Sequence, residues 1–314
     1  MSSPSLLARI DGALPGRTGA FAILLFVALC WAGTIIAGRA ATPEVPPLTI
    51  NFWRWTVALL AILPFTGRAL IAKRSAIRAH WRGLLLLGCL NMTAFGGLFF
   101  LGLEHTQAIN GSILLATMTI NIVLVSWLFF GVGISRLQIG GVAIGFLGIL
   151  TIIVRGEPAV LLTLSVGIGD PLLWASTLCY AFYSTSLGRA PAALSPAELM
   201  AVLCAVGAIT GLPLFLLEAV VLGRVADWTP GAMAAVGFIA LFPSLIAQIL
   251  WVASVARVGA NTAGYFIYTV PVFGTAMAIV FLGEELRWYH AAGIVLVFAG
   301  VYAATSRAGR AQTG

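Results

Sequence analysis

Aromatic, amide and hydroxyl side chains recur at helical spacing within otherwise apolar segments of the sequence. Tyr180 and Tyr183 are three residues apart, as are Gln248 and Trp251, so each pair lies on one face if its segment is helical. Aromatic rings cover apolar groups and attract ammonium groups, while amides bind amino or carboxyl ends. We therefore expect a site for a small amphipathic molecule. The residues expected to bind it are Trp31, Asn91, Asn121, Tyr180, Tyr183, Gln248, Trp251, Tyr265 and Tyr268.

These residue types also have structural uses in membranes. Tyr and Trp gather at membrane interfaces, and hydroxyl or amide side chains often bond to a neighbouring helix. Arg54 lies near the end of an apolar segment, where we expect its long side chain to extend outward to water rather than to bind a carboxylate. The sequence alone leaves the binding and structural alternatives open.

Residues for catalysis or metal binding form no recognisable set. The three histidines are scattered, and the four cysteines (Cys30, Cys89, Cys179 and Cys204) lie in apolar segments without CxxC spacing, which indicates small buried hydrophobes. No Walker motif occurs, so an ATP-driven pump would need a separate subunit. The sequence predicts no enzyme activity, no metal and no cofactor. An integral-membrane enzyme is the weaker alternative.

The elements that must position the polar residues are predicted to be transmembrane helices. The 314 residues are 61% hydrophobic and 9% charged, against roughly 25% charged residues in soluble domains. Apolar runs of about 20 residues, long enough to cross the hydrocarbon layer, recur along the chain, and their lack of alternation argues against a barrel. Ten spans are predicted: 20–40, 48–66, 83–103, 109–132, 137–154, 170–188, 196–222, 231–255, 260–282 and 288–305. The run 158–168 is too short to span and is expected at the interface.

Basic residues indicate the orientation. Arg68, Lys73, Arg74, Arg78 and Arg82 crowd one short loop without a nucleic-acid recognition motif, and an excess of Lys and Arg is typical of cytoplasmic loops. Placing this loop in the cytoplasm puts both termini there, as an even number of spans requires. We expect a multi-pass protein of the cell (inner) membrane with a small-molecule substrate and the lipid bilayer as partners, no nucleic acid, and a monomeric or homodimeric state.

The sequence repeats itself at an interval of about 150 residues. Residues 29–40 read LCWAGTIIAGRA and residues 178–190 read LCYAFYSTSLGRA, and Leu63-Pro64 corresponds to Leu212-Pro213. Each half holds five spans, an odd number, so the halves are inserted upside down relative to each other, as in many secondary transporters. The predicted division is a cytoplasmic N-terminus (1–19), a first repeat (20–155), a connecting loop (156–169), a second repeat (170–305) and a cytoplasmic tail (306–314).

Several motifs resemble the drug/metabolite transporter superfamily in its EamA-type branch of ten-span carriers. The residues that carry the resemblance are Trp31, Pro47, Arg54-Trp55, Gly102-Leu103, Thr106, Ala108, Pro271, Gly283-Glu284-Glu285, Gly293 and Gly300. The first half departs from the closing pattern, with Thr119 in place of Pro271 and Gly131-Val132-Gly133 in place of Gly-Glu-Glu. The resemblance implies an exporter of amino acids, metabolites or drugs with a cavity lined by spans one, three, four, six, eight and nine.

The mode of transport is predicted from the position of ionisable residues. Candidates for proton coupling lie only at span edges: Glu104, His105, Glu284, Glu285 and His290. Proton-coupled carriers usually place such a group along the pathway, so we expect a facilitative or weakly coupled carrier. The alternatives are a drug or other metabolite exporter, a channel-like facilitator, and a structural membrane protein without transport.

Overall fold

The computed structural model describes residues 16–41, 44–106, 108–164, 167–282 and 285–306, and these residues form helices and no strands. The first half contains α2 (Gly16–Ala41), α3 (Pro47–Ala72), α4 (Arg74–Ala79), α5 (Trp81–Gly88), η1 (Cys89–Phe95), α6 (Gly96–Glu104), α7 (Ala108–Phe130) and α8 (Arg136–Ile153). After η2 (Pro158–Thr163), the second half contains α9 (Gly169–Ser186), η3 (Leu187–Arg189), α10 (Pro196–Leu216), η4 (Leu217–Val221), α11 (Pro230–Ile239), η5 (Ala240–Ile246), α12 (Ala247–Val258), α13 (Ala260–Tyr265), η6 (Phe266–Tyr268), α14 (Thr269–Leu282) and α15 (Trp288–Thr305).

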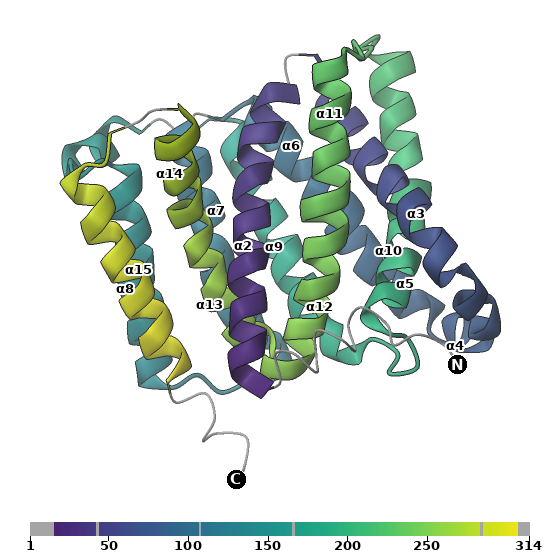
Figure 1. Cartoon of the computed structure of the whole chain (residues 1–314), viewed down its shortest axis with the longest axis horizontal. Helices are drawn as coiled ribbons and strands as arrows, with labels where there is room; N and C mark the ends of the chain where they lie inside the picture. Colours follow the sequence, from purple (N-terminus) through teal and green to yellow (C-terminus); the bar gives the residue numbers. More distant parts are fainter. Residues whose placement is uncertain (1–15, 42–43, 107, 165–166, 283–284, 307–314) are drawn as a thin grey trace.

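These helices stand side by side as one bundle (Figure 1). Within the described residues, eight of the predicted spans are long and apolar enough to cross a membrane. The other two are α9, which carries several hydroxyl residues, and the segment α13–η6–α14, which is broken into short pieces. Large apolar side chains such as Phe65 (87% exposed) point outward, as expected for a surface that faces lipid.

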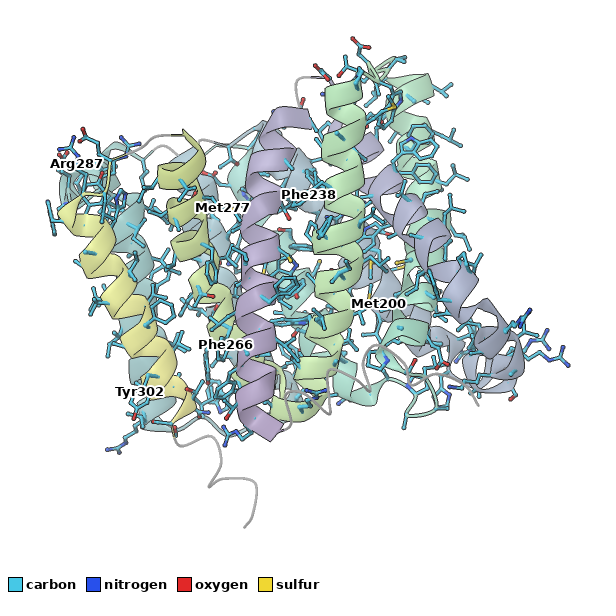
Figure 2. All side chains as sticks on the ribbon, in the orientation of Figure 1. Met200, Phe238, Phe266, Met277, Arg287 and Tyr302 are labelled. Atoms are coloured by element: carbon cyan, nitrogen blue, oxygen red, sulfur yellow. The ribbon has the colours of Figure 1, made fainter. Side chains whose placement is uncertain are left out.

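Both ends of the described chain lie at the same end of the bundle. Gly16 begins α2 and Thr305 ends α15 at the end that carries α4, which is called the lower end below (Figure 1). Charged side chains gather at the two ends, with Arg287 at the upper end, while Tyr302 projects from the outer face of α15 (Figure 2). Residues 1–15, 107, 283–284 and 307–314 lie outside the described part, so the predictions for the chain termini and for Gly283 and Glu284 fall there.

Local sequence signals begin and end the helices. Ser135 begins α8 and Ser195 begins α10 with a capping box, in which Ser and the Gln or Glu three residues later each accept a backbone N–H. Pro196 occupies the first turn of α10, where its missing N–H has no acceptor to lose. Gly259, with φ +80°, separates α12 from α13, because only glycine adopts this conformation readily.

Contacts between helices follow the pattern of two inverted repeats. The first helix of the first repeat, α2, packs on α12 and α14, and its counterpart α9 packs on η1–α6 and α7. These contacts correspond, since α12 and η1–α6 lie in the third pass of each repeat and α14 and α7 in the fourth. The equivalent helices α3 and α10 pack on each other, and so do α8 and α15. The chain is therefore an all-helical membrane protein built from two inverted repeats.

Glycine faces allow α8 and α15 to approach closely. A Cβ atom on Gly141 would lie 2.6 Å from the Gly300 carbonyl oxygen, and one on Gly148 would lie 2.8 Å from the Gly293 carbonyl oxygen. Small residues are typical of such close helix contacts in membranes. This contact joins the two repeats.

Candidate functional site

Three aromatic rings from three helices meet inside the bundle. Trp31 of α2 lies 5.1 Å from Trp251 of α12 and 5.9 Å from Tyr180 of α9, measured between ring centroids. Tyr180 and Trp251 are also 5.9 Å apart, and Phe95 and Tyr183 lie against Tyr180 at 5.0 and 5.7 Å. These five residues are called the aromatic cluster below. Because α2 belongs to the first repeat while α9 and α12 belong to the second, the cluster lies at the junction of the repeats.

Polar groups surround this cluster without saturating one another. Gln248 lies close to Tyr180, and Asn91, which is fully buried, lies close to Tyr183. Gln248 faces the Tyr180 hydroxyl and Asn91 faces the Tyr183 hydroxyl, but neither contact has the geometry of a hydrogen bond within 3.5 Å. Among the described residues, the two hydroxyls, both polar atoms of the Asn91 amide and the Trp251 indole nitrogen therefore make no regular hydrogen bond. A buried polar group without a partner costs about 1–3 kcal/mol. Such a concentration of them is expected where a polar ligand or water binds.

Wide helical turns position the polar groups. Asn91 lies in η1, a π-helical turn in the third pass of the first repeat, and η5 is a π-helical turn in the third pass of the second repeat. The indole nitrogen of Trp31 donates a 3.3 Å hydrogen bond to the carbonyl oxygen of Pro243 in η5. Turns of this type recur at functional sites because they expose backbone groups that a regular helix would saturate.

The third pass of the first repeat is held in place by hydrogen bonds from α3. The Asn51 amide and the Trp55 indole both donate to the carbonyl oxygen of Met92, at 3.0 and 2.9 Å. These bonds hold η1 at Met92, the residue that follows Asn91. The sequence-based reasoning did not identify Asn51 or Phe95. The helical spacing of Asn51 and Trp55 could have indicated a shared face, whereas Phe95 lies in an apolar run that gives no signal.

The other three predicted binding residues contact different partners. Asn121 donates a 2.8 Å hydrogen bond to the Thr177 hydroxyl and so joins α7 to α9. The Tyr268 ring lies against Gly145 of α8, where an added Cβ atom would be 2.5 Å from the ring. Tyr265 packs near Tyr268 in a smaller core with Val123 and Ala304. The structure thus brings six of the nine predicted residues together and places these three outside the aromatic cluster.

The observed position of the Arg54 side chain differs from the predicted one. Its side chain is only 6% exposed, and its guanidinium carbon lies 4.5 Å from the Trp55 ring and 5.3 Å from the Phe100 ring. The prediction that Arg54 extends outward to water is wrong, because the Trp55 and Phe100 rings supply an attraction for the cation inside the bundle.

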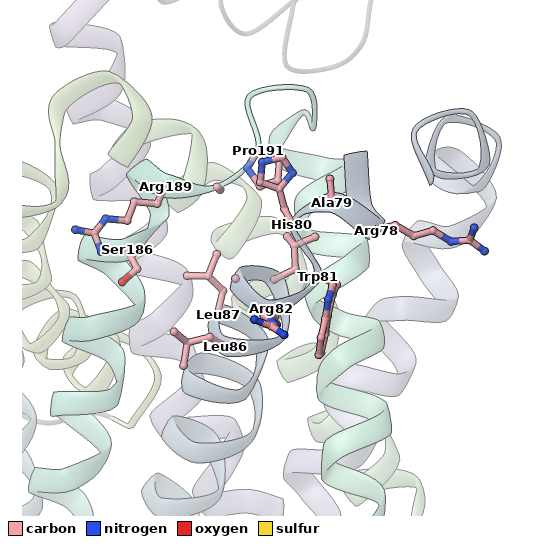
Figure 3. Close-up of a pocket in the computed structure, with 13 residues that line it drawn as sticks. Arg78, Ala79, His80, Trp81, Arg82, Leu86, Leu87, Ser186, Arg189 and Pro191 are labelled. Carbon is pink, nitrogen blue, oxygen red and sulfur yellow. The ribbon is translucent and has the colours of Figure 1, made fainter. Parts of the chain in front are cut away.

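A surface pocket of about 450 Å³ lies at the lower end of the bundle, away from the aromatic cluster (Figure 3). It is bounded by the start of α5 and by the segment that follows α9. Its lining includes Arg78, His80, Arg82, Ser186 and Arg189. None of the predicted binding residues lines it.

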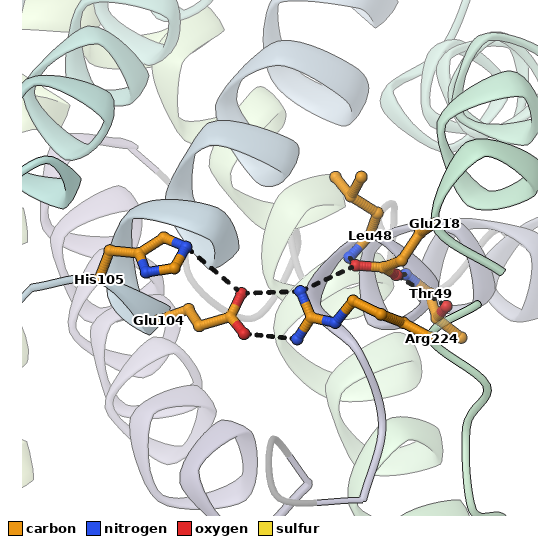
Figure 4. A network of polar contacts seen from close by, with 6 residues as sticks. All are labelled: Leu48, Thr49, Glu104, His105, Glu218 and Arg224. Carbon is orange, nitrogen blue, oxygen red and sulfur yellow. Dashed lines mark hydrogen bonds and ion pairs between the residues drawn. The ribbon is translucent and has the colours of Figure 1, made fainter. Parts of the chain in front are cut away.

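An ion-pair network lies at the opposite, upper end (Figure 4). Arg224 donates two hydrogen bonds to the Glu104 carboxylate, one of them at 3.1 Å, and lies 4.0 Å from the Glu218 carboxylate. The hydrogen bond to Glu104 raises the pKa of Arg224. Glu218, only 1% exposed, accepts from the backbone N–H groups of Leu48 and Thr49 at 3.2 and 2.7 Å. The carboxylate of η4 therefore caps the first turn of α3.

The side chains that could bind a metal ion are dispersed in the described residues. Across the described ranges, no three His, Cys, Asp or Glu side chains come together in a way that could hold a metal ion. Cys30 and Cys204 are buried as free thiols, and Cys89 and Cys179 are half-buried.

Comparison with known proteins gives consistent results over nearly the whole chain. The model of the EamA-like transporter family matches residues 18–154 and again residues 167–306. The chain is 26% identical to the uncharacterized transporter YyaM of Bacillus subtilis, over 82% of this chain and 84% of that protein. It is 26% identical to a probable terminal-alkyne amino-acid exporter of Streptantibioticus cattleyicolor, over 88% of this chain and 90% of that protein. A solved crystal structure with 19% sequence identity has the same fold, with a TM-score of 0.76 over 94% of this chain and 99% of that one.

Proposed function

The chain belongs to the EamA-like transporter family, and from this premise we propose that it carries amino acids or similar small amphipathic metabolites out of the cell by alternating access. The observation that supports the substrate class is the aromatic cluster with its unpartnered amide and hydroxyl groups. Aromatic faces contact apolar portions of a substrate and attract its ammonium group, and amides bind its carboxylate. A relative named as a probable amino-acid exporter supports the same class.

The proposed binding residues are Trp31, Asn91, Tyr180, Tyr183, Gln248 and Trp251. They come from both repeats, which suits a site that opens first to one side and then to the other as the repeats exchange conformations. Asn121, Tyr265 and Tyr268 are proposed to support this movement through helix contacts rather than to contact substrate. Export from the cytoplasm, with both termini on the cytoplasmic side of the inner membrane, is part of the same proposal.

The test is transport by the purified protein in liposomes. Vesicles loaded with a pool of labelled amino acids and metabolites are diluted into buffer, and efflux is measured by mass spectrometry for the wild type and for Trp251→Ala. Trp127→Ala is the control, since Trp127 is 54% exposed on the outer face of α7. We expect saturable efflux that shows counterflow, reduced at least tenfold by Trp251→Ala and unchanged by Trp127→Ala.

Two results would contradict the proposal. Flux that rises linearly with substrate and shows no counterflow would indicate a channel-like facilitator. Saturable efflux restricted to compounds without an amino or carboxyl group would indicate a drug or other metabolite exporter and would remove the proposed substrate class.

A further inference from the structure

The pocket at the lower end of the bundle has a strongly basic lining. Arg78, Arg82 and Arg189 contribute guanidinium groups and His80 an imidazole, and none of the 13 lining residues is acidic. Among the described residues, no carboxylate lies within 4.0 Å of the three guanidinium groups. Arg82 and Arg189 lie over the Trp81 and Phe130 rings, at 5.5 and 4.4 Å, and these contacts leave the positive charge of the lining without a counter-ion, so an anion in this pocket is favoured.

The lining residues offer suitable donors for such an anion. Figure 3 shows Arg82 between Arg78 and Arg189, which extend in opposite directions at the two sides. Nδ1 of His80 is 3.0 Å from the carbonyl oxygen of Ala76, which leaves Nε2 for another partner. The pocket also includes Trp81 and Gly83 of the first turn of α5. The first backbone N–H groups of a helix lack intrahelical acceptors and favour anions.

The position of the pocket indicates where this anion comes from. The apolar run that continues through η1 and α6 begins at Trp81, so the pocket lies where hydrocarbon gives way to the headgroup layer. Trp81 and Leu86 line the pocket and are 54% and 57% exposed, so apolar surface adjoins the basic groups on the side that faces lipid. A free anion would leave this apolar surface uncovered, whereas a phospholipid covers it with its acyl chains.

We propose that this pocket binds the phosphodiester headgroup of an anionic membrane phospholipid. Arg82 holds the phosphate, His80 and the first turn of α5 donate further hydrogen bonds, and the acyl chains lie along Trp81 and Leu86. Arg78 and Arg189 add positive charge at the two sides of the pocket. Basic pockets between membrane helices are a recognised class of site for anionic headgroups. The site is separate from the aromatic cluster and does not depend on which substrate is transported.

The test measures lipid binding by native mass spectrometry of the full chain in detergent. Titrants are dioctanoyl phosphatidylglycerol, dioctanoyl phosphatidylcholine and inorganic phosphate, applied to the wild type and to the double variant Arg82→Gln/Arg189→Gln. The matched control is Arg68→Gln/Arg74→Gln, which removes the same charge from exposed positions outside the pocket. We expect the wild type and the control to bind phosphatidylglycerol equally and the pocket variant to bind it at least tenfold more weakly.

Each contrary result overturns a defined part of the proposal. Equal weakening in the control variant would show attraction to net charge rather than to the pocket. Equal affinity for phosphatidylcholine would remove the preference for anionic lipid. Competition by inorganic phosphate at the same concentration as phosphatidylglycerol would identify a site for free anions. If the double variant does not elute as a single species, Arg82→Gln and Arg189→Gln are measured singly, and unchanged affinity in both refutes the site.

Discussion

Individual residues carry two different kinds of buried polarity in this protein. Glu218 is saturated by the amide groups that it caps, whereas Asn91 and Tyr183 keep polar atoms without a hydrogen-bond partner among the described residues. The first kind stabilises the fold, and the second lowers stability unless water or a ligand is bound. We therefore expect a bound substrate to stabilise the protein most at the unsatisfied groups at the junction of the two repeats.

Arg54 allows a residue-level test of its surroundings. Because its planar guanidinium lies over Trp55 and Phe100, Arg54→Lys should lose the stacking while keeping the charge, and we expect a loss of about 1–2 kcal/mol in unfolding free energy. Arg54→Met removes a costly buried charge at similar volume and should leave stability nearly unchanged. Thermal unfolding in detergent measures both. Greater destabilisation by Met than by Lys would show that the charge itself has a partner.

Residue roles were the least predictable part of the sequence. The polar types within apolar segments were sufficient to identify the six residues now found around the aromatic cluster. They could not separate these from Asn121, which has the same type and spacing but bonds to Thr177. The sequence predicted that the Arg54 side chain reaches water, because Arg54 lies near the end of its span. The contacts with Trp55 and Phe100, which keep it inside the bundle, could not be read from the sequence.

At the scale of elements, the contact between α8 and α15 depends on backbone approach. Gly141→Ala would place a methyl group 2.6 Å from backbone atoms of α15, while the neighbouring Gly140→Ala meets nothing within 4 Å. We expect Gly141→Ala to cost about 1–3 kcal/mol through overpacking and Gly140→Ala to be neutral or slightly stabilising, because alanine favours helix. Thermal unfolding of the two variants in detergent measures this difference in stability. Equal midpoints would mean that the helices separate more easily than the structure indicates.

A second prediction concerns Glu218 of η4, whose carboxylate caps the start of α3. Glu218→Ala leaves two backbone N–H groups and the Thr49 hydroxyl without their acceptor, so we expect a loss of at least about 2 kcal/mol. Glu157→Ala is the control, since Glu157 is exposed. Hydrogen exchange at residues 48–52 should accelerate in the Glu218 variant alone. Unchanged exchange there would show that water replaces the carboxylate at no cost.

Elements were predicted well where apolar length decides them. The predicted span 137–154 agrees with α8 and 288–305 with α15, because a hydrocarbon layer requires about 20 apolar residues. The predicted span 48–66 ends too early, since α3 continues past Arg68 to Ala72. The π-helical turn η1 was not predicted, because its sequence contains neither Pro nor Gly. For η5, Pro243 gave a signal for an irregular helix.

For the whole molecule, the distribution of carboxylates predicts the energetics of transport. Glu218 is saturated by the amides of α3, and Asp170 accepts from Asn110 at 3.0 Å and from the Gly167 N–H at 2.9 Å, so both have structural roles at span ends. We expect transport in proteoliposomes to follow the substrate gradient and an imposed pH gradient to drive no accumulation. Uphill uptake that collapses on adding a proton ionophore would contradict this expectation.

Whole-molecule architecture was predictable because duplication leaves a trace in the sequence. The matching runs at 29–40 and 178–190 predicted two inverted repeats, and the pairing of α2 with α12 and of α9 with η1–α6 bears this out. Substrate identity was not predictable, since aromatic and amide groups suit many amphipathic molecules. Orientation in the membrane rests on loop charge and stays a prediction.

Two pairs of equivalent helices, α3 with α10 and α8 with α15, stand on opposite sides of the bundle (Figure 1). Each pair is antiparallel and fastened at two heights: Glu218 contacts Thr49 while Glu198 contacts Lys73, and Gly148 meets Gly293 while Gly141 meets Gly300. We expect these two pairs to form a frame that keeps its shape during the proposed transport cycle. The movement would then be confined to the helices between the two pairs, and we expect the π-helical turns η1 and η5 to be the points at which these helices bend.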